Sequence, residues 1–187
     1  MRPTDIDLSG YRQSTTIVNG LVTTVFIPID DRITQALDSI ADNSLLDRWI
    51  LGTYKDLDAP DPDAACWDWR GTVTAKNYGL ITVTRSIADR CFQVGAHIVA
   101  WTIEHGTVPR WALIDGRLHR LVLDHTCCGA DANCPGGRTC RHRRCQNVRH
   151  LELVSNSENV RRGKGRHGEK AAQVAAEARR RQLGMGV

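Results

Sequence analysis

The sequence has no long apolar run. None of its hydrophobic stretches approaches the roughly 18 consecutive residues that a membrane-spanning helix needs. The N-terminal segment MRPTDIDLSG lacks the apolar core of a secretory signal peptide. No internal repeat is visible, which argues against a repeat array. From these absences we expect a cytoplasmic protein that does not enter a membrane.

The composition instead suits a globular chain that is rich in cysteine. At 187 residues with 41% hydrophobic residues, one domain with tails is the natural expectation, and two small lobes are possible. Five of the seven cysteines fall within 127–145. A disulfide framework would usually spread its cysteines more widely and follow a signal peptide. The clustering therefore favours metal binding.

The charges are unevenly distributed. Residues 1–116 carry a net charge of −5 and residues 117–187 carry +9, which gives the total of +4. A basic C-terminal part suggests a polyanionic partner on that side. An ordinary solvated surface explains the same asymmetry equally well.

Apolar patterning predicts strands and a helix in the N-terminal part. Residues 14–28 are rich in Val, Ile and Thr and indicate one or two strands. Residues 31–53 place apolar side chains on one helix face, with an interruption near Asn43 and Ser44. The acidic stretch 56–65 contains two prolines and is the best candidate linker. Residues 1–60 are therefore expected to form an extension with a β-hairpin and a helix.

The middle of the chain predicts a hairpin followed by a helix. Residues 66–71 and 78–86 are expected to pair as a β-hairpin. Apolar residues and histidines then recur at helical spacing over residues 94–105. Gly106 suits the position just after that helix.

Two further strands are expected around a long Cys-rich loop, at 117–124 and 151–155. Ser155 and Glu158 form an S-x-x-E capping box, which predicts that a helix begins there. Asn159 then lies at the start of this helix.

Asp124, His125 and Asn159 are residue types that a phosphodiester-cleaving site needs. Such a site requires a nucleophilic water, a base and positive charge at the phosphate. An imidazole, with its pKa of about 6.5, suits the base. A carboxylate and an amide oxygen suit Mg²⁺ or Mn²⁺. Because neighbouring side chains on a strand point to opposite faces, Asp124 and His125 reach one phosphate only at a strand end or a bulge.

This part of the chain resembles the HNH endonucleases, particularly the phage-type and homing enzymes of the ββα-metal fold. Asp124 and His125 match the family's Asp-His pair at the end of its first strand. Asn147, in CQNVRHL, matches its middle Asn, and LELVSNSENVRRG matches the strand-to-helix segment that carries the last metal ligand. CWDWRG, the Asn-Tyr-Gly turn at 77–79 and AHIVAWTIEHGTVP resemble the lead-in of phage HNH proteins.

The resemblance implies an α+β protein with a zinc-stabilised ββα-metal core that hydrolyses double-stranded DNA. His125 would be the general base, and Asp124 and Asn159 would hold one Mg²⁺ or Mn²⁺ ion. Asn147 would fix the loop and help to orient the base. The products would carry 5′-phosphate and 3′-hydroxyl ends.

The resemblance covers about residues 66–163. We therefore expect a nuclease domain over 66–166, preceded by the extension 1–60. The remaining residues, 167–187, are expected to form a basic tail that is helical or disordered.

The Cys-rich loop predicts structural zinc, because zinc takes four nitrogen or sulfur ligands and a fully ligated ion has no position for water. Cys127, Cys145 and His150 resemble the His-Cys-box subset of the same fold, in which they share one zinc ion. The fourth ligand is open between Cys140, which we place first, and Cys134 or Cys66. A second site is an additional possibility, and its ligands would be Cys128, Cys134, Cys140 and His142.

Basic side chains flank the candidate sites and suit DNA phosphates, which predicts an affinity that falls steeply with salt. These residues are Arg141, Arg143, Arg144, Arg161, Arg162, Lys164 and Arg166. Two other functions fit the same residues. One is a zinc-containing DNA-binding module or regulator without catalysis, and the other is a nuclease toxin. The oligomeric state, on which nicking or double-strand cleavage depends, is open.

Overall fold

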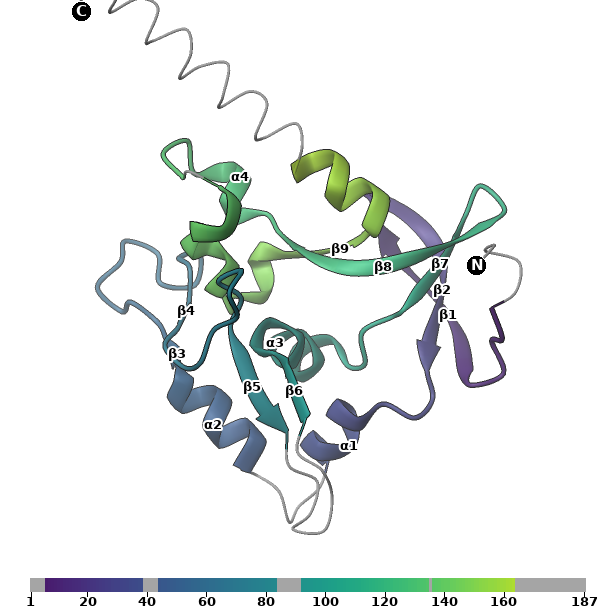
Figure 1. Cartoon of the computed structure of the whole chain (residues 1–187), viewed down its shortest axis with the longest axis horizontal. Coiled ribbons are helices and arrows are strands. Elements are labelled where there is room, and N and C mark those ends of the chain that lie inside the picture. Colours follow the sequence, from purple (N-terminus) through teal and green to yellow (C-terminus); the bar gives the residue numbers. More distant parts are fainter. Residues whose placement is uncertain (1–5, 39–43, 84–91, 135, 164–187) are drawn as a thin grey trace, which may run out of the picture.

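The protein is a mixed α+β chain, as predicted (Figure 1). The computed structural model describes residues 6–38, 44–83, 92–134 and 136–163. Its strands are β1 (Tyr11–Val18), β2 (Leu21–Pro28), β3 (Thr53–Tyr54), β4 (Asp68–Trp69), β5 (Leu80–Val83), β6 (Phe92–Gly95), β7 (Trp111–Ile114), β8 (Arg117–His125) and β9 (Leu151–Ser155). Its helices are α1 (Arg32–Asp38), α2 (Ser44–Gly52), α3 (Ala96–His105), α4 (Cys127–Ala130) and a last helix whose described part spans 156–163.

Five strands form one antiparallel sheet in the order β1-β2-β7-β8-β9. Two tight turns connect neighbours within it. Asn19 and Gly20 join β1 to β2 with φ of 53° and 80°, and Asp115 and Gly116 join β7 to β8 with φ of 49° and 71°. Two-residue turns with positive φ match the twist of paired strands, and Asn, Asp and Gly adopt them readily. The predicted strand region 14–28 is therefore a hairpin.

The sheet curls until its two edges approach each other. The side chain of Asn19, in the first turn, contacts Ser155 at the end of β9. Its Oδ1 accepts a hydrogen bond from the Ser155 backbone N–H at 3.0 Å, and its Nδ2 lies 3.4 Å from the Ser155 hydroxyl. Strands contributed by the predicted extension and by the predicted nuclease region thus belong to one sheet.

Two apolar cores lie on either side of α3, which occupies the centre of the molecule in Figure 1. The core under the sheet consists of Val18, Val25, Ile27, Ala112, Leu121 and Leu153. The other core joins α1 and α2 to α3 and β5, through Ile33, Ala36, Leu45, Trp69, Ile81, Val83, Ala96 and Val99. Both cores draw on the first 60 residues.

The predicted hairpin between 66–71 and 78–86 is wrong. β4 pairs with β3 instead, and β5 pairs with β6. The buried indole of Trp69 explains part of this arrangement. A Cβ added at Gly52, Gly71 or Gly79 would lie within 2.5–2.7 Å of Trp69 atoms. Glycine backbone therefore surrounds this ring. Among the described residues the two predicted strands form no ladder, and an isolated bridge joins Val73 to Gly79 instead. Residues 84–86 of the second predicted strand lie outside the described residues.

The helix predicted over residues 94–105 is shorter than expected. Residues 92–95 form a strand because they pair with β5, so α3 begins only at Ala96. It ends before Gly106, whose φ is 75°, as the sequence predicted. The region 31–53 contains α1 and α2, and residues 39–43 between them, where part of the predicted interruption falls, lie outside the described residues. In the described part of the chain, no helix is long and apolar enough to span a membrane.

Candidate active site and metal centres

Asp124 and His125 lie at the C-terminal end of β8. His125 is the last residue of the strand and pairs with Leu151, while Asp124 pairs with Glu152 of β9. The side chains are buried, with 6% of Asp124 and 5% of His125 exposed. The strand end therefore supplies the local geometry that two neighbouring residues need if they are to face one site.

Asn159 comes from the last helix, which begins directly after β9. The hydroxyl of Ser155 accepts a hydrogen bond from the backbone N–H of Glu158 at 3.2 Å, so the predicted N-cap is confirmed. Glu158 does not complete the capping box, because its carboxylate binds the guanidinium groups of Arg161 and Arg162. The cap fixes where the helix begins and so brings Asn159 beside β8.

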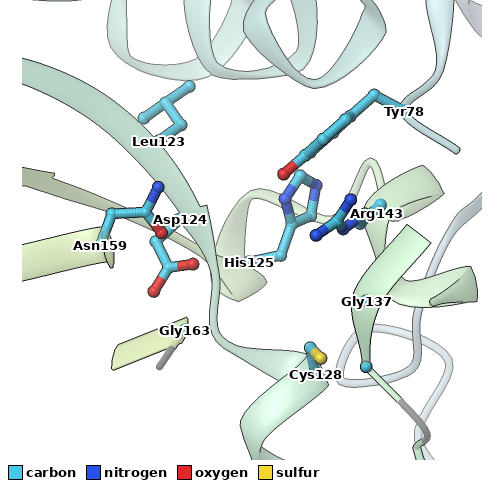
Figure 2. Close-up of a pocket in the computed structure, with 10 residues that line it drawn as sticks. Tyr78, Leu123, Asp124, His125, Cys128, Gly137, Arg143, Asn159 and Gly163 are labelled. Carbon is cyan, nitrogen blue, oxygen red and sulfur yellow. The ribbon is translucent and has the colours of Figure 1, made fainter. Parts of the chain in front are cut away.

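Asp124, His125 and Asn159 line one cavity of about 180 Å³. Figure 2 shows the Asp124 carboxylate next to the Asn159 amide on one side of the β8 ribbon, and the His125 imidazole on the other side, towards Tyr78 and Arg143. The remaining lining residues are Tyr78, Leu123, Cys128, Gly136, Gly137, Arg143 and Gly163. Three residues that the sequence singled out for one site therefore meet in the structure.

The His125 ring is held by a backbone carbonyl and by neighbouring rings. Its Nε2 lies 3.2 Å from the carbonyl oxygen of Cys145. Tyr78 and His97 pack against it with ring centroids at 5.9 and 4.9 Å. Burial lowers the pKa of His125 to about 4, although the Cys145 carbonyl and then Asp124 act in the opposite direction. The imidazole is therefore neutral at pH 7.

Asn147 is fully buried, and its side chain forms hydrogen bonds with the backbone of two separate segments. Its Nδ2 donates to the carbonyls of Asp63 and Ala65 at 2.8 and 2.7 Å, and its Oδ1 accepts from the Arg149 N–H at 3.0 Å. It ties the predicted linker region to the segment before β9. The hydrogen bonds of Asn147 do not include His125, so any influence on the base passes through the loop that carries Cys145.

The Arg162 guanidinium lies within ion-pair distance of the Asp124 carboxylate. Its Nη1 lies 3.5 Å from Asp124 Oδ2, but its shorter contacts are 2.6 Å to Glu152 and 2.9 Å to Glu158. Two carboxylates other than Asp124 thus balance most of its charge. Arg161 is also engaged, through Glu158.

The predicted DNA-binding arginines of the Cys-rich loop differ in their surroundings. Arg143 lines the cavity, donates to the Lys76 carbonyl at 3.1 Å and lies over the Tyr78 ring at 4.9 Å. Arg144 donates to the Asn77 side chain, whereas Arg141 is exposed. Lys164 and Arg166 lie outside the described residues.

The cysteines and histidines form two separate groups, each of which could hold a metal ion such as zinc. In each group, one potential ligand atom per residue lies within 4.8 Å of all the others. The first group is Cys66, Cys127, Cys145 and His150, and the second is Cys128, Cys134, Cys140 and His142. The structure thus places Cys66 with the first three predicted ligands, and it places Cys140 and Cys134 in the second group.

The first group connects the segment before β4 to both strands of the candidate site. His150 Nδ1 lies 3.4 Å from the Cys145 sulfur and 3.5 Å from the Cys66 sulfur. Contacts with Cys145 and Cys66 raise the pKa of the Cys127 thiol, whereas hydrogen bonds from Cys127 and Cys66 lower the pKa of Cys145 to about 4. Closely spaced thiols whose pKa values shift in opposite directions are suited to binding one divalent cation as thiolates.

Two residues of the candidate sites, Tyr78 and Cys66, carry only a weak signal in the sequence. Tyr78 lies in the Asn-Tyr-Gly turn, which the sequence marks only through its resemblance to phage HNH proteins. Its ring packs against His125 and lines the cavity. Cys66 was the most distant of three alternatives. A cysteine placed directly before an aromatic-rich strand was the only available signal for it.

Comparison with known proteins gave no match. No family model, no curated protein and no solved structure is similar enough to this chain to be reported as related.

Proposed function

We propose that the protein is a metal-dependent DNA endonuclease of the HNH type, in which β8, β9 and the helix at 156–163 form a ββα-metal unit. The order of the parts supports this proposal. A strand ends in Asp124 and His125, a loop with two candidate zinc sites follows, and a second strand leads into a helix that carries Asn159.

The observation that carries the proposal is the common cavity. A carboxylate, an imidazole and an amide, which a binding module would not need together, line one space of about 180 Å³ beside Arg143. Catalysis of phosphodiester hydrolysis requires a base, an anchored cation and a positive group within reach of one phosphate. This cavity offers a residue for each role.

His125 suits the general base. A carbonyl oxygen only accepts hydrogen bonds, so the contact with Cys145 requires the proton on Nε2. The lone pair is then on Nδ1, which can take a proton from water. Because burial keeps the ring neutral, this acceptor is present at pH 7.

Asp124 and Asn159 would hold the divalent ion, Mg²⁺ or Mn²⁺. One carboxylate and one neutral oxygen leave most of the coordination shell to water and phosphate, as is usual for Mg²⁺. The ion would supply positive charge at the phosphorane and the leaving oxygen. Arg162 does not replace it, since Glu152 and Glu158 bind that guanidinium more closely than Asp124 does.

Arg143 would bind the scissile phosphate, because its guanidinium group lines the same cavity. The exposed Arg141 is placed to contact a neighbouring phosphate of double-stranded DNA. Both contacts predict binding that weakens steeply as salt is raised.

A plasmid-nicking assay tests the proposal. We expect His125→Ala to slow cleavage in Mg²⁺ by about 10²–10⁴-fold, the usual contribution of a general base, with little change in DNA affinity. His119→Ala, on the same strand but away from the cavity, is the matched control. Mg²⁺ should be withheld from zinc-loaded protein rather than removed with excess EDTA, because EDTA also competes for zinc.

Wild-type cleavage by His125→Ala would reject this base. A wild-type protein that binds DNA but never cuts it, in Mg²⁺ or Mn²⁺, would favour the non-catalytic DNA-binding module instead.

A further inference from the structure

The second Cys/His group has the geometry of a closed tetrahedral site. Its three sulfurs lie 3.3–3.6 Å apart, and His142 Nδ1 lies 3.2 Å from Cys134 and 3.7 Å from Cys140. A tetrahedron with Zn–S bonds of about 2.3 Å has sulfurs about 3.8 Å apart. The observed spacing is slightly tighter, so a zinc ion requires only small movements.

Polar groups around the second group favour a bound cation. The other ring nitrogen of His142, Nε2, lies 3.6 Å from the Asp131 carboxylate. A carboxylate at this position orients a metal-bound imidazole and increases its basicity. The Gly136 backbone N–H also points at the Cys134 sulfur, at 3.4 Å, which stabilises a thiolate. These contacts are independent of the distances among the ligands.

The same segment forms one wall of the candidate active site. Cys128, Gly136 and Gly137 line the cavity, and Arg143 directly follows the ligand His142. Few apolar side chains lie between Cys128 and His142, so packing alone gives this wall little stability. A bound ion would fix its path.

A second connection runs from the metal ligands to the His125 ring. The Cys140 carbonyl accepts a hydrogen bond from Asn77 Nδ2 at 2.9 Å, and Asn77 accepts two from Arg144. The ring of Tyr78, the next residue, lies 4.9 Å from the Arg143 guanidinium and 5.9 Å from the His125 ring. The position of Cys140 is thereby linked to the position of Tyr78.

We propose that the second group binds a zinc ion of its own, and that this ion holds the cavity wall and places Arg143 and Tyr78 over the reacting position. Zinc binding by the second group does not depend on any enzymatic activity. The placement of Arg143 for catalysis rests on the function proposed above. The zinc ion of the second group thus positions Arg143 and Tyr78 but takes no part in the reaction.

Zinc content and thiol titration test zinc binding by the second group. Wild-type protein should contain two zinc ions per chain, and Cys134→Ser should contain one. The control is Cys91→Ser, which leaves all eight residues of the two groups unchanged and should keep two. Cobalt should reproduce this pattern, with cysteine-to-cobalt absorption falling by about half in Cys134→Ser. A single zinc ion in the wild type after reconstitution with excess zinc would overturn the proposal. So would a Cys134–Cys140 disulfide, revealed by two missing thiols.

Hydrogen exchange tests the wall without reference to catalysis. In Cys134→Ser the backbone N–H groups of residues 136–145 should exchange faster, while those of β8 and β9 should keep their protection. Unchanged exchange over 136–145 after loss of one zinc ion would reject the organising role. Loss of protection throughout the sheet would also reject it, since the ion would then support the whole fold.

Cleavage provides a separate result. If the wild type nicks DNA, Cys134→Ser should do so about 100-fold more slowly, the scale of effect that misplacing a reacting group by about 1 Å produces. Undiminished nicking would reject the placement of Arg143 by the ion. If the wild type never nicks DNA, the proposed function fails, but the zinc count and the exchange pattern still decide the role of the second group.

Discussion

The contact between Asn19 and Ser155 should contribute measurably to stability, because it joins the first hairpin to the start of the last helix. Asn19→Gly removes both hydrogen bonds, at 3.0 and 3.4 Å, but retains the freedom to adopt the positive φ of this turn. Ser155 is only 3% exposed, so water does not readily replace a lost partner. Leaving a buried donor without its acceptor costs about 1–3 kcal/mol.

Asn19→Asp is the matched control. Its side chain keeps an acceptor for the Ser155 N–H and tolerates positive φ, and it loses only the longer contact from Nδ2. A negative charge close to the first turn of the helix at 156–163 is also favourable. We therefore expect Asn19→Asp to lose less than half of the stability that Asn19→Gly loses.

Urea denaturation followed by tryptophan fluorescence measures the difference, with thermal unfolding as a second measurement. Each kcal/mol should lower Tm by about 2–4 °C in a chain of this size. The reasoning is refuted if Asn19→Gly is as stable as the wild type within about 0.5 kcal/mol. Equal destabilisation by Gly and Asp would also refute it, because the effect would then not depend on the acceptor.

Two further predictions concern the first metal group and the last helix. Cys66→Ser should lower Tm and remove one zinc ion, because an ion in the first group would hold residue 66 against Cys127 and Cys145. A variant with wild-type zinc content would exclude Cys66 as a ligand. Hydrogen bonds from Arg161 and then Arg162 lower the pKa of Glu158 to about 2. The ion pairs of Glu158 should therefore be fully formed above the ordinary pKa of a carboxyl group and be lost only as the pH falls towards 2. Carboxyl chemical shifts of Glu158 measure this, and a midpoint near the unperturbed 4.5 would contradict it.

The features that could be predicted from the sequence are those fixed by local chemistry. Gly106 ends α3 because its positive φ is accessible to glycine, and Ser155 caps the last helix because its hydroxyl reaches an N–H three residues ahead. β8 and β9 were predicted from their β-branched and leucine-rich composition. Asp124, His125 and Asn159 could be singled out because their spacing relative to these elements was informative.

The features that could not be predicted depend on which distant segments meet. No local signal shows that β2 pairs with β7, or that β4 pairs with β3 rather than with β5. The fourth ligand of the first metal group is similar, since Cys66 is distant in the sequence and only the tertiary fold brings it close to Cys127 and Cys145. Cys140, the first choice among three alternatives, lies instead with its neighbours of the Cys-rich loop in the second group.

The contact between Asn19 and Ser155 also has a consequence for folding during translation. Its two residues are 136 positions apart, so the hairpin leaves the ribosome long before its partner has been synthesised. Until then the curled sheet has an open edge and Asn159 has no fixed place. A nascent chain that ends before residue 155 therefore cannot close the sheet or complete the candidate site.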